Sequence, residues 1–201
     1  MKTYCYAVII LLFTSCGPYD EMEQTIFIPD ETDKNLPAYT EWGYNSFGAK
    51  YERMYFFSTN NIVPCKITVY NGMMTFSLSG RVGSSNAMYG GSGESMTLFF
   101  SFPVNEPMND YKDLMVLHQK HIDLSDTACE LRMMRGSNTE DITLLSGDLF
   151  FQRVQLLRIN EQENRVILSG TFELMFLRNQ LPELLSKGRF DVGIANLFVL
   201  P

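Results

Sequence analysis

The dipeptide Asn71-Gly72 constrains the fold of this 201-residue chain more than any other feature. It stands between residues 65–70 (CKITVY) and residues 73–79 (MMTFSLS), and in both segments apolar and polar residues alternate. Asn and Gly accept the positive φ angles of a tight two-residue turn, and alternation directs one face of each strand toward a core. The pattern therefore predicts a β-hairpin with one apolar and one polar face.

The rest of the chain is also rich in short apolar segments bounded by turn residues. We expect strands over residues 47–57, 96–102, 128–134, 148–158, 165–177 and 189–199. Residues 111–120 are the best helix candidate, and residues 181–187 are expected to form one or two helical turns, with Pro182 at their start. Strands do not alternate with helices as in a parallel sheet. We therefore predict an antiparallel β-sandwich, or a partly open barrel, of about eight or nine strands with one or two short helices.

The tripeptide Leu-Ser-Gly occurs at residues 78–80, 145–147 and 168–170. The spacing is uneven, so the tripeptide does not mark a solenoid repeat. Glycine in or beside a strand often marks a bulge or a close approach of two backbones. We expect one of these two roles at each of the three sites.

The N-terminal residues have the form of an export signal. Residues 1–3 carry one positive charge, and residues 4–13 form an apolar run about half as long as a membrane-spanning helix. The run ends in Phe13-Thr14-Ser15-Cys16, which resembles the lipobox of bacterial lipoproteins. The resemblance implies cleavage before Cys16, a diacylglyceryl thioether on its sulfur and acylation of the new amine, which together anchor a protein stably in a membrane. An ordinary secretory signal with a chance cysteine is the alternative.

We therefore divide the chain into a signal peptide (residues 1–15), the lipidated Cys16 with an acidic linker (residues 16–40), and a single β-sandwich domain (residues 41–201). Within the linker, residues 25–28 are apolar enough to add a short strand to the domain. The acids that follow the cysteine resemble the tether of surface-exported lipoproteins of the Bacteroidota: Asp20, Glu21 and Glu23. This implies an outer-membrane anchor with the domain at the cell surface. A solvated spacer on a periplasm-facing lipoprotein is the alternative.

Two C-terminal segments resemble a known group of proteins. Residues 168–174 (LSGTFEL) and 187–192 (KGRFDV) are similar to the "GTF…GRFDV" end of β-sandwich lipoproteins of unknown function from gut Bacteroidota. Residues 45–49 (NSFGA) resemble the first strand of the same group. These patches cover 18 residues, and the group has no settled activity. The resemblance implies the fold and the envelope location and provides no site residues.

The charge pattern limits the possible partners. The net charge is −7, from 16 basic and 23 acidic residues, and the sequence has no Lys/Arg cluster, so nucleic acid is not expected as a partner. His118 and His121, with Asp123 and Asp126, are the only metal-type group, but they fit no common zinc template. We expect a polar helix end there, with no metal and no cofactor.

The cysteines leave two alternatives open. Cys5 is lost with the signal and Cys16 is lipidated, so Cys65 and Cys129 remain as an even pair in an oxidising compartment. They form a disulfide or stay as two buried free thiols, because both lie in strand-like apolar segments. Neither has a histidine neighbour in sequence, so no catalytic cysteine is expected.

Three aromatic residues at the start of the domain are the candidate ligand contacts: Tyr39, Trp42 and Tyr44. Aromatic rings on a loop can stack on the apolar face of a sugar. The alternative is a hydrophobic plug that packs the linker onto the sandwich.

These observations favour a membrane-anchored envelope lipoprotein that acts as a non-catalytic binding module for a glycan or a protein. No catalytic set is visible in the sequence. A structural or assembly component of a surface filament or envelope complex is the alternative, and an open sheet edge or a flat apolar patch would favour it. An enzyme, most simply a hydrolase, would need a deep pocket with converging carboxylates.

Overall fold

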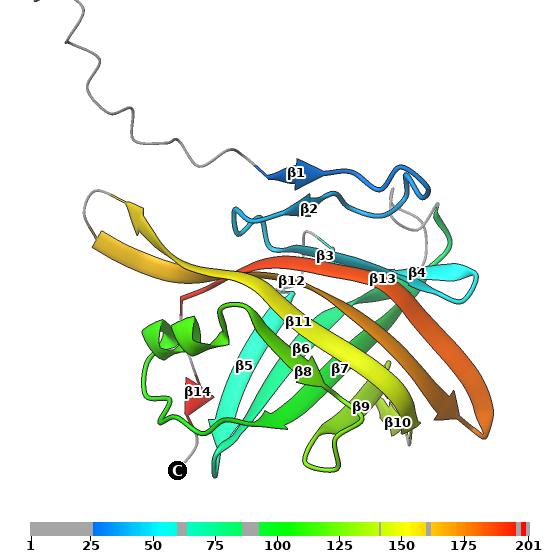
Figure 1. The fold of residues 1–201 in the computed structure, drawn as a ribbon. Coiled ribbons are helices and arrows are strands. Elements are labelled where there is room, and N and C mark those ends of the chain that lie inside the picture. Colours follow the sequence, from blue (N-terminus) through cyan, green and yellow to red (C-terminus); the bar gives the residue numbers. More distant parts are fainter. Residues whose placement is uncertain are drawn as a thin grey trace, which may run out of the picture.

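The computed structural model describes residues 26–59, 64–85, 93–140, 142–159, 162–195 and 198–199. Within them, twelve strands form one curled sheet shaped as a half-barrel, and two further strands form a small second sheet beside it (Figure 1). Neighbouring strands are antiparallel except for one short parallel pair, β5 with β14. The predicted all-β fold is confirmed, and it takes the form of the partly open barrel. Cys16 and the lipobox lie outside the described residues.

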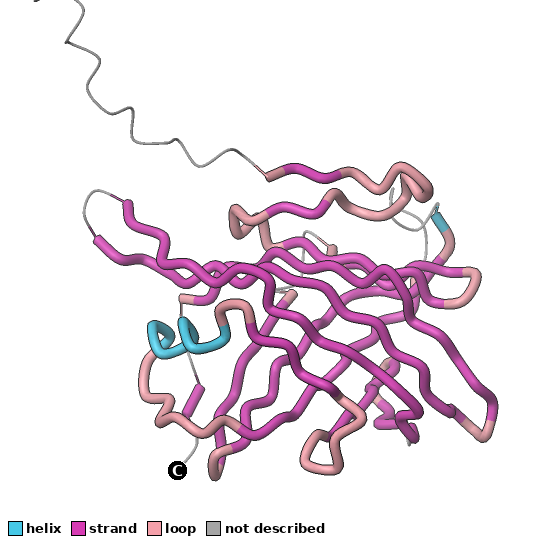
Figure 2. The backbone as a smooth tube through the Cα atoms, in the orientation of Figure 1, coloured by secondary structure: helices cyan, strands magenta, loops and turns pink. Residues whose placement is uncertain are grey.

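Most of the described chain lies in strands (Figure 2). The small sheet pairs β1 (Phe27–Ile28) with β2 (Tyr39–Thr40). The large sheet has the order β10 (Asn138–Glu140), β9 (Glu130–Arg135), β7 (Glu94–Pro103), β6 (Met73–Gly83), β4 (Met54–Phe57), β3 (Ser46–Tyr51), β13 (Leu181–Ile194), β12 (Gln162–Arg178), β11 (Ile142–Ile159) and β8 (Lys120–Asp123). In addition, β5 (Cys65–Tyr70) pairs with β6 and with β14 (Phe198–Val199).

The hairpin at Asn71-Gly72 is confirmed. Tyr70 pairs with Met73, and the register continues to Cys65 opposite Leu78. Asn71 and Gly72 have φ angles of 48° and 76°, as a turn of the I′ type requires. The same strand β6 pairs with β4 at its other end and with β7 along its opposite edge, so the sheet forks at β6.

The prediction of helical turns over residues 181–187 is wrong, because these residues belong to strand β13. Asn179 and Gln180 form the preceding turn, with φ angles of 52° and 64°. Strand β12 therefore reverses directly into β13, with Arg178 opposite Leu181. Glutamine is an uncommon residue at positive φ. The sequence therefore has the Asn of the usual Asn-Gly turn but lacks the Gly, and the hairpin could not be recognised from it.

The helix expected over residues 111–120 is shorter and tighter than predicted. It is the seven-residue 3₁₀ helix η1 (Tyr111–Leu117), which begins at a capping box formed by Asp110 and Asp113. The chain leaves the helix at His118, and the next residue, Gln119, has a φ of 60°. Strand β8 follows at once, and this ends the helix before the two histidines can share a helical face.

The core lies on the concave side of the sheet and is built from aromatic rings of distant strands. Phe76 of β6, Phe151 of β11 and Phe190 of β13 contact one another, with ring centres 5.1 to 5.7 Å apart. Gly170 lies beneath this cluster. A Cβ there would lie 2.0 Å from the Phe150 carbonyl oxygen and 2.7 Å from Phe190 Cζ, which confirms the close approach predicted for the third Leu-Ser-Gly.

The convex side of the sheet, which we call the outer face, is partly covered by residues 26–45, which we call the N-terminal strap. The strap contains β1 and β2 and lies over β3 and β13 (Figure 1). Residues 26–40 were expected to be mainly linker, with one possible strand at residues 25–28. They contribute both strands of the small sheet and the buried side chains of Leu36 and Tyr39.

Candidate functional site

The strap is fixed to the sheet by a buried carboxylate. Asp191 of β13 is 2% exposed, although it points to the outer face. It accepts hydrogen bonds from the backbone N–H groups of Trp42, Gly43 and Tyr44, at 2.6 to 3.2 Å. The hydroxyls of Thr40 and Ser169 also donate to it. One side chain thus satisfies three backbone donors of the chain that crosses it, as burial of polar groups requires.

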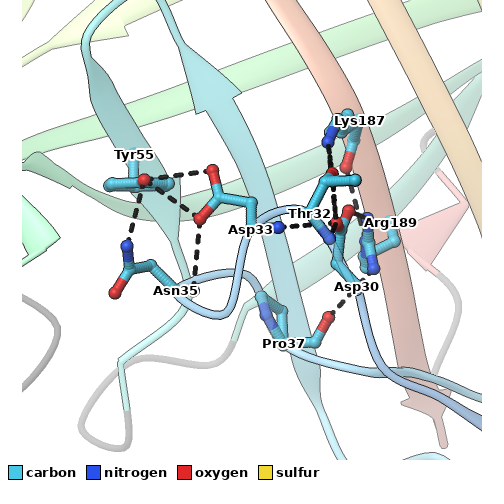
Figure 3. Close-up of polar contacts among 8 residues, drawn as sticks. All are labelled: Asp30, Thr32, Asp33, Asn35, Pro37, Tyr55, Lys187 and Arg189. Atoms are coloured by element: carbon cyan, nitrogen blue, oxygen red, sulfur yellow. Dashed lines mark hydrogen bonds and ion pairs between the residues drawn. The ribbon is translucent and has the colours of Figure 1, made fainter.

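A second set of polar contacts ties down the beginning of the strap (Figure 3). Asp30 accepts hydrogen bonds from the Thr32 hydroxyl, the Asp33 backbone N–H and the Arg189 guanidinium, the last at 2.7 Å. Lys187 lies 3.5 Å from the same carboxyl group. The Thr32 hydroxyl first, and then Arg189, hold the pKa of Asp30 well below its usual range.

Strand β3, the first strand of the large sheet along the chain, has a glycine where the strap packs against it. A Cβ on Gly48 of β3 would lie 2.3 Å from Pro37 Cδ, so the strap packs this closely only against glycine. Further along, the Tyr55 hydroxyl donates to Asp33 and accepts a hydrogen bond from the Asn35 amide. The strap is therefore part of the folded domain and forms one wall of the groove described next.

Beside the strap, the outer face of four strands forms an open groove with a volume of about 630 Å³. The strand register places His121, Phe150, Thr171 and Arg189 in one row across β8, β11, β12 and β13. A second row contains Asp123, Asp148 and Glu173. The groove is lined by members of both rows and by Gln152, Phe172, Lys187 and Gly188 from the sheet, and by Ile28, Asp30 and Tyr39 from the strap.

The groove combines both signs of charge with one aromatic floor residue. The His121 ring lies 2.9 Å from the Asp148 carboxylate and 6.1 Å, centre to centre, from the half-buried ring of Phe150. Asp148 and Glu173 lie directly opposite each other on β11 and β12, and both are exposed. Such a site offers carboxylate acceptors and an apolar ring surface on rigid strands, a composition suited to binding a polar molecule.

A second open depression of about 760 Å³ shares Gln152 with the groove. It lies where β11 extends beyond the short edge strand β8. Here side chains replace the missing strand partner: the Val154 N–H donates to His118 Nδ1, and the Gln119 amide donates to the Gln152 carbonyl. This part of the sheet edge is therefore occupied by side-chain hydrogen bonds.

The three predicted aromatic contacts are not brought together. Tyr39 lines the groove but is 7% exposed, and its hydroxyl donates to Glu41. Burial, and then the hydrogen bond to Glu41, raise the pKa of Tyr39. Trp42 lines a separate hollow of about 150 Å³, and Tyr44 is 66% exposed. Tyr39 packs the strap onto the sheet, as the alternative of a hydrophobic plug describes, whereas Trp42 and Tyr44 are exposed.

The possible disulfide is not formed, and Cys65 and Cys129 are free thiols. Cys65 is buried in β5 opposite Leu78, and burial raises the pKa of its thiol. Cys129 precedes β9 and donates a weak hydrogen bond to the Asp123 carbonyl at 3.6 Å. Of the two alternatives, the structure has the free thiols, with Cys65 buried and Cys129 half-buried.

The histidine group is dispersed. His118 faces the edge of β11, whereas His121 pairs with Asp148 on the outer face. The Asp123 carboxylate accepts from the backbone and hydroxyl of Ser125, which lowers its pKa. Among the described residues, no group of three or more His, Cys, Asp or Glu side chains is placed to hold a metal ion.

Sequence reasoning singled out Tyr39 and His121 but missed most of the other residues that form the groove. Asp148, Phe150, Thr171 and Glu173 alternate with buried residues, and this alternation was the available signal for an outward direction. What the sequence lacked was the pairing of β11 with β8 and the position of the strap beside them.

No protein-family model matches the chain, and no curated protein or solved structure is significantly similar to it. In the described part of the chain, no helix has the length and apolar character needed to cross a membrane. The interpretation of the groove therefore rests on its own geometry and chemistry.

Proposed function

We propose that this chain is an envelope lipoprotein, held in the outer membrane by lipid on Cys16, whose β domain is a non-catalytic binding module. The lipobox-like segment and the acidic residues after it support the anchor. The groove between the strap and the outer face is the proposed ligand site. It needs no cofactor and takes a glycan or protein ligand.

The observation that carries the binding role is the way the groove is built. Four strands and the strap contribute to it, and the strap is fixed in place by the contacts of Asp30 and Asp191. Sites on rigid strands hold their side chains in fixed positions, which favours recognition of a particular ligand. A volume of about 630 Å³ lies within the range of small-molecule and cofactor sites.

The binding role is tested by filling the groove. Thr171 is exposed on β12 inside the groove, so Thr171→Trp places a large ring where a ligand would lie. Thr143→Trp is the matched control, since Thr143 is exposed on β11 and does not line the groove. The full chain, purified in detergent and immobilised, is exposed to solubilised envelope material of the source cells. The proposal expects retention of a component by the wild type and by Thr143→Trp but not by Thr171→Trp. Equal retention by all three, or none, contradicts it.

The anchor is tested separately with Cys16→Ala. The variant should leave the membrane fraction, and the wild type should be digested by protease added to intact cells. Protection of the wild type until lysis would place the domain in the periplasm. Unchanged membrane association of Cys16→Ala would contradict the lipid anchor.

One observation favours the second candidate function, a structural or assembly role. Leu145, Met175 and Leu184 are exposed on the outer faces of β11, β12 and β13, and Met175 lies directly opposite Leu184. Contiguous exposed apolar residues often mark a contact with another protein. In this alternative, that end of the sheet contacts a partner in an envelope complex.

A further inference from the structure

We propose that the ligand of the groove is an uncharged saccharide that stacks a sugar ring on Phe150 and donates hydroxyl hydrogen bonds to Asp148 and Glu173. This inference rests on the proposed function, because it names the ligand class of the same groove. It follows from three features of the described residues: the aromatic floor, the paired carboxylates and the charge balance.

The aromatic floor is the first feature. Phe150 points to the outer face of β11, lines the groove and is only half-buried, so part of its ring remains accessible. Its cross-strand neighbour Thr171 has a short side chain, whereas its other neighbour is the ring of His121. A sugar ring has one face made of C–H groups, which packs on an aromatic ring while its hydroxyls remain at the edge. The floor of the groove therefore matches the apolar face of a sugar.

The paired carboxylates are the second feature. Asp148 and Glu173 lie one row away from Phe150 and Thr171, which is roughly 7 Å along a strand. Two like charges directly opposite each other in a sheet destabilise the fold. Ionised carboxylates accept several hydrogen bonds, and hydroxyl groups donate them. The two neighbouring carboxylates therefore repel each other in the free protein, and they accept hydrogen bonds when hydroxyls of a ligand lie above them.

The charge balance is the third feature. Both cationic side chains of the groove, Lys187 and Arg189, already contact Asp30. The His121 ring contacts Asp148, whereas Glu173 adds a further negative charge. The groove therefore offers a poor site for phosphate, sulfate or an acidic sugar. A neutral saccharide fits its hydrogen-bond acceptors without requiring a free cation.

The experiment is a binding assay on an oligosaccharide array that carries neutral and sialylated glycans, with hexalysine as the cationic probe. The full chain is applied in detergent, and the affinity for each bound glycan is then measured by calorimetry. We expect a neutral glycan to bind, with affinity at least tenfold weaker for Phe150→Ala and about fivefold weaker for Glu173→Gln.

The matched controls also face outward, but they lie on strands at the other end of the sheet order. Phe99 is a half-buried, outward-facing phenylalanine of β7, and Glu130 is an exposed glutamate of β9. Phe99→Ala and Glu130→Gln should change the affinity less than twofold. Should Phe150→Ala fail to fold, Thr171→Trp tests the same contact, and it should abolish glycan binding.

The failure of this inference differs from that of the proposed function. If groove-dependent retention of envelope material is observed but no neutral glycan binds, or if hexalysine or a sialylated glycan binds instead, the assignment of an uncharged saccharide is wrong and the binding role stands. A glycan that binds equally to wild type and Thr171→Trp also overturns the assignment. Loss of the groove-dependent retention itself removes the proposed function.

Discussion

Two regions on the outer face of β12 differ in solvent exposure, and the region that contains the polar residue is the buried one. At one end, Ile167 and Ser169 are 2% and 0% exposed beneath the strap. At the other end, Met175 points to the same side of the sheet and is 42% exposed. A serine is thus buried where a methionine is not. The strap covers the end of β12 where the sheet provides acceptors for the backbone N–H groups of the strap. The hydrophobicity of the outward residues therefore does not decide which end is covered.

The hydrogen bonds of the covered region explain this choice. The strap crosses the sheet as irregular chain, and its N–H groups need acceptors once water is excluded. Asp191 provides them for three consecutive residues, and Glu41 of the strap lies 3.2 Å from Arg153 of β11. The exposed side chains that mark the uncovered region, Leu145, Met175 and Leu184, are apolar and offer no carboxylate to a crossing chain. It is suited to an apolar partner and unsuited to a crossing chain.

The largest expected effect is the loss of the buried carboxylate. Asp191→Ala leaves the N–H groups of Trp42, Gly43 and Tyr44 without their acceptor, and we expect the free energy of unfolding to fall by about 3 to 5 kcal/mol. Trp42 is the only tryptophan of the chain, so its fluorescence reports the position of the strap. Urea denaturation followed by Trp42 fluorescence measures both the free energy of unfolding and the position of the strap in the folded state.

The control for this variant is Asp148→Ala, because Asp148 is an exposed carboxylate of the same face. Its removal should change the unfolding free energy by less than about 1 kcal/mol. If Asp191→Ala is no less stable than Asp148→Ala and its Trp42 emission is unchanged, then Asp191 does not hold the strap.

The second expected effect compares the two apolar residues of β12. Ile167→Ala removes a side chain packed under the strap, where Gly43 approaches it, and should lower the unfolding free energy by about 2 to 4 kcal/mol. Met175→Ala removes an exposed side chain from the same face and should cost less than about 0.5 kcal/mol. Equal losses in chemical denaturation would mean that the two regions are covered alike.

Strand β12 could be predicted from the sequence, since the expected residues 165–177 lie within its observed range of Gln162–Arg178, but which of its outward residues are covered could not. Val166, Leu168, Leu174 and Phe176 alternate toward the core, and this periodicity gave the strand. Ile167 and Met175 interrupt the alternation with apolar residues on the outer face. Periodicity cannot tell whether such a residue lies under another segment or in solvent, because that depends on a segment distant in sequence.

The site was harder to predict for the same physical reason. Tyr39 was identified as a ligand contact, and it does line the groove, yet its partners on β11 and β12 are more than 100 residues away. Register between distant strands is set by packing and bulges, such as the shift between Phe151 and Arg153. The aromatic residues were visible in the sequence, whereas the row that joins Phe150 to His121 required the sheet.

The third expected effect concerns the start of the strap. The Thr32 hydroxyl, followed by Arg189, lowers the pKa of Asp30, so the folded state favours its carboxylate form. The resulting stabilisation is complete above the unfolded pKa near 4 and is lost as the pH falls toward the lower folded value. Asp30→Asn should therefore be about 1 to 2 kcal/mol less stable than wild type at pH 7, with a difference that shrinks below about pH 4.

This prediction is checked by urea denaturation at pH 7, 5 and 3. Glu31→Gln is the control, because Glu31 is an exposed neighbour in the same strap. Its difference from the wild type should be small at each pH. A deficit of Asp30→Asn that is as large at pH 3 as at pH 7 would show that the Asp30 carboxylate does not contribute through its charge.

The smallest expected effect tests the uncovered region. Met175 and Leu184 face each other across β12 and β13, and both are exposed, so the double variant Met175→Ser with Leu184→Ser should change the unfolding free energy by less than about 0.5 kcal/mol. Removing two apolar side chains from water-exposed positions costs no core packing. A loss above about 1 kcal/mol that grows with protein concentration would show instead that this surface is buried between copies of the chain. Sedimentation velocity of the wild type and the double variant separates these two cases. Only a surface buried between copies of the chain predicts an oligomer of the wild type that dissociates in the double variant.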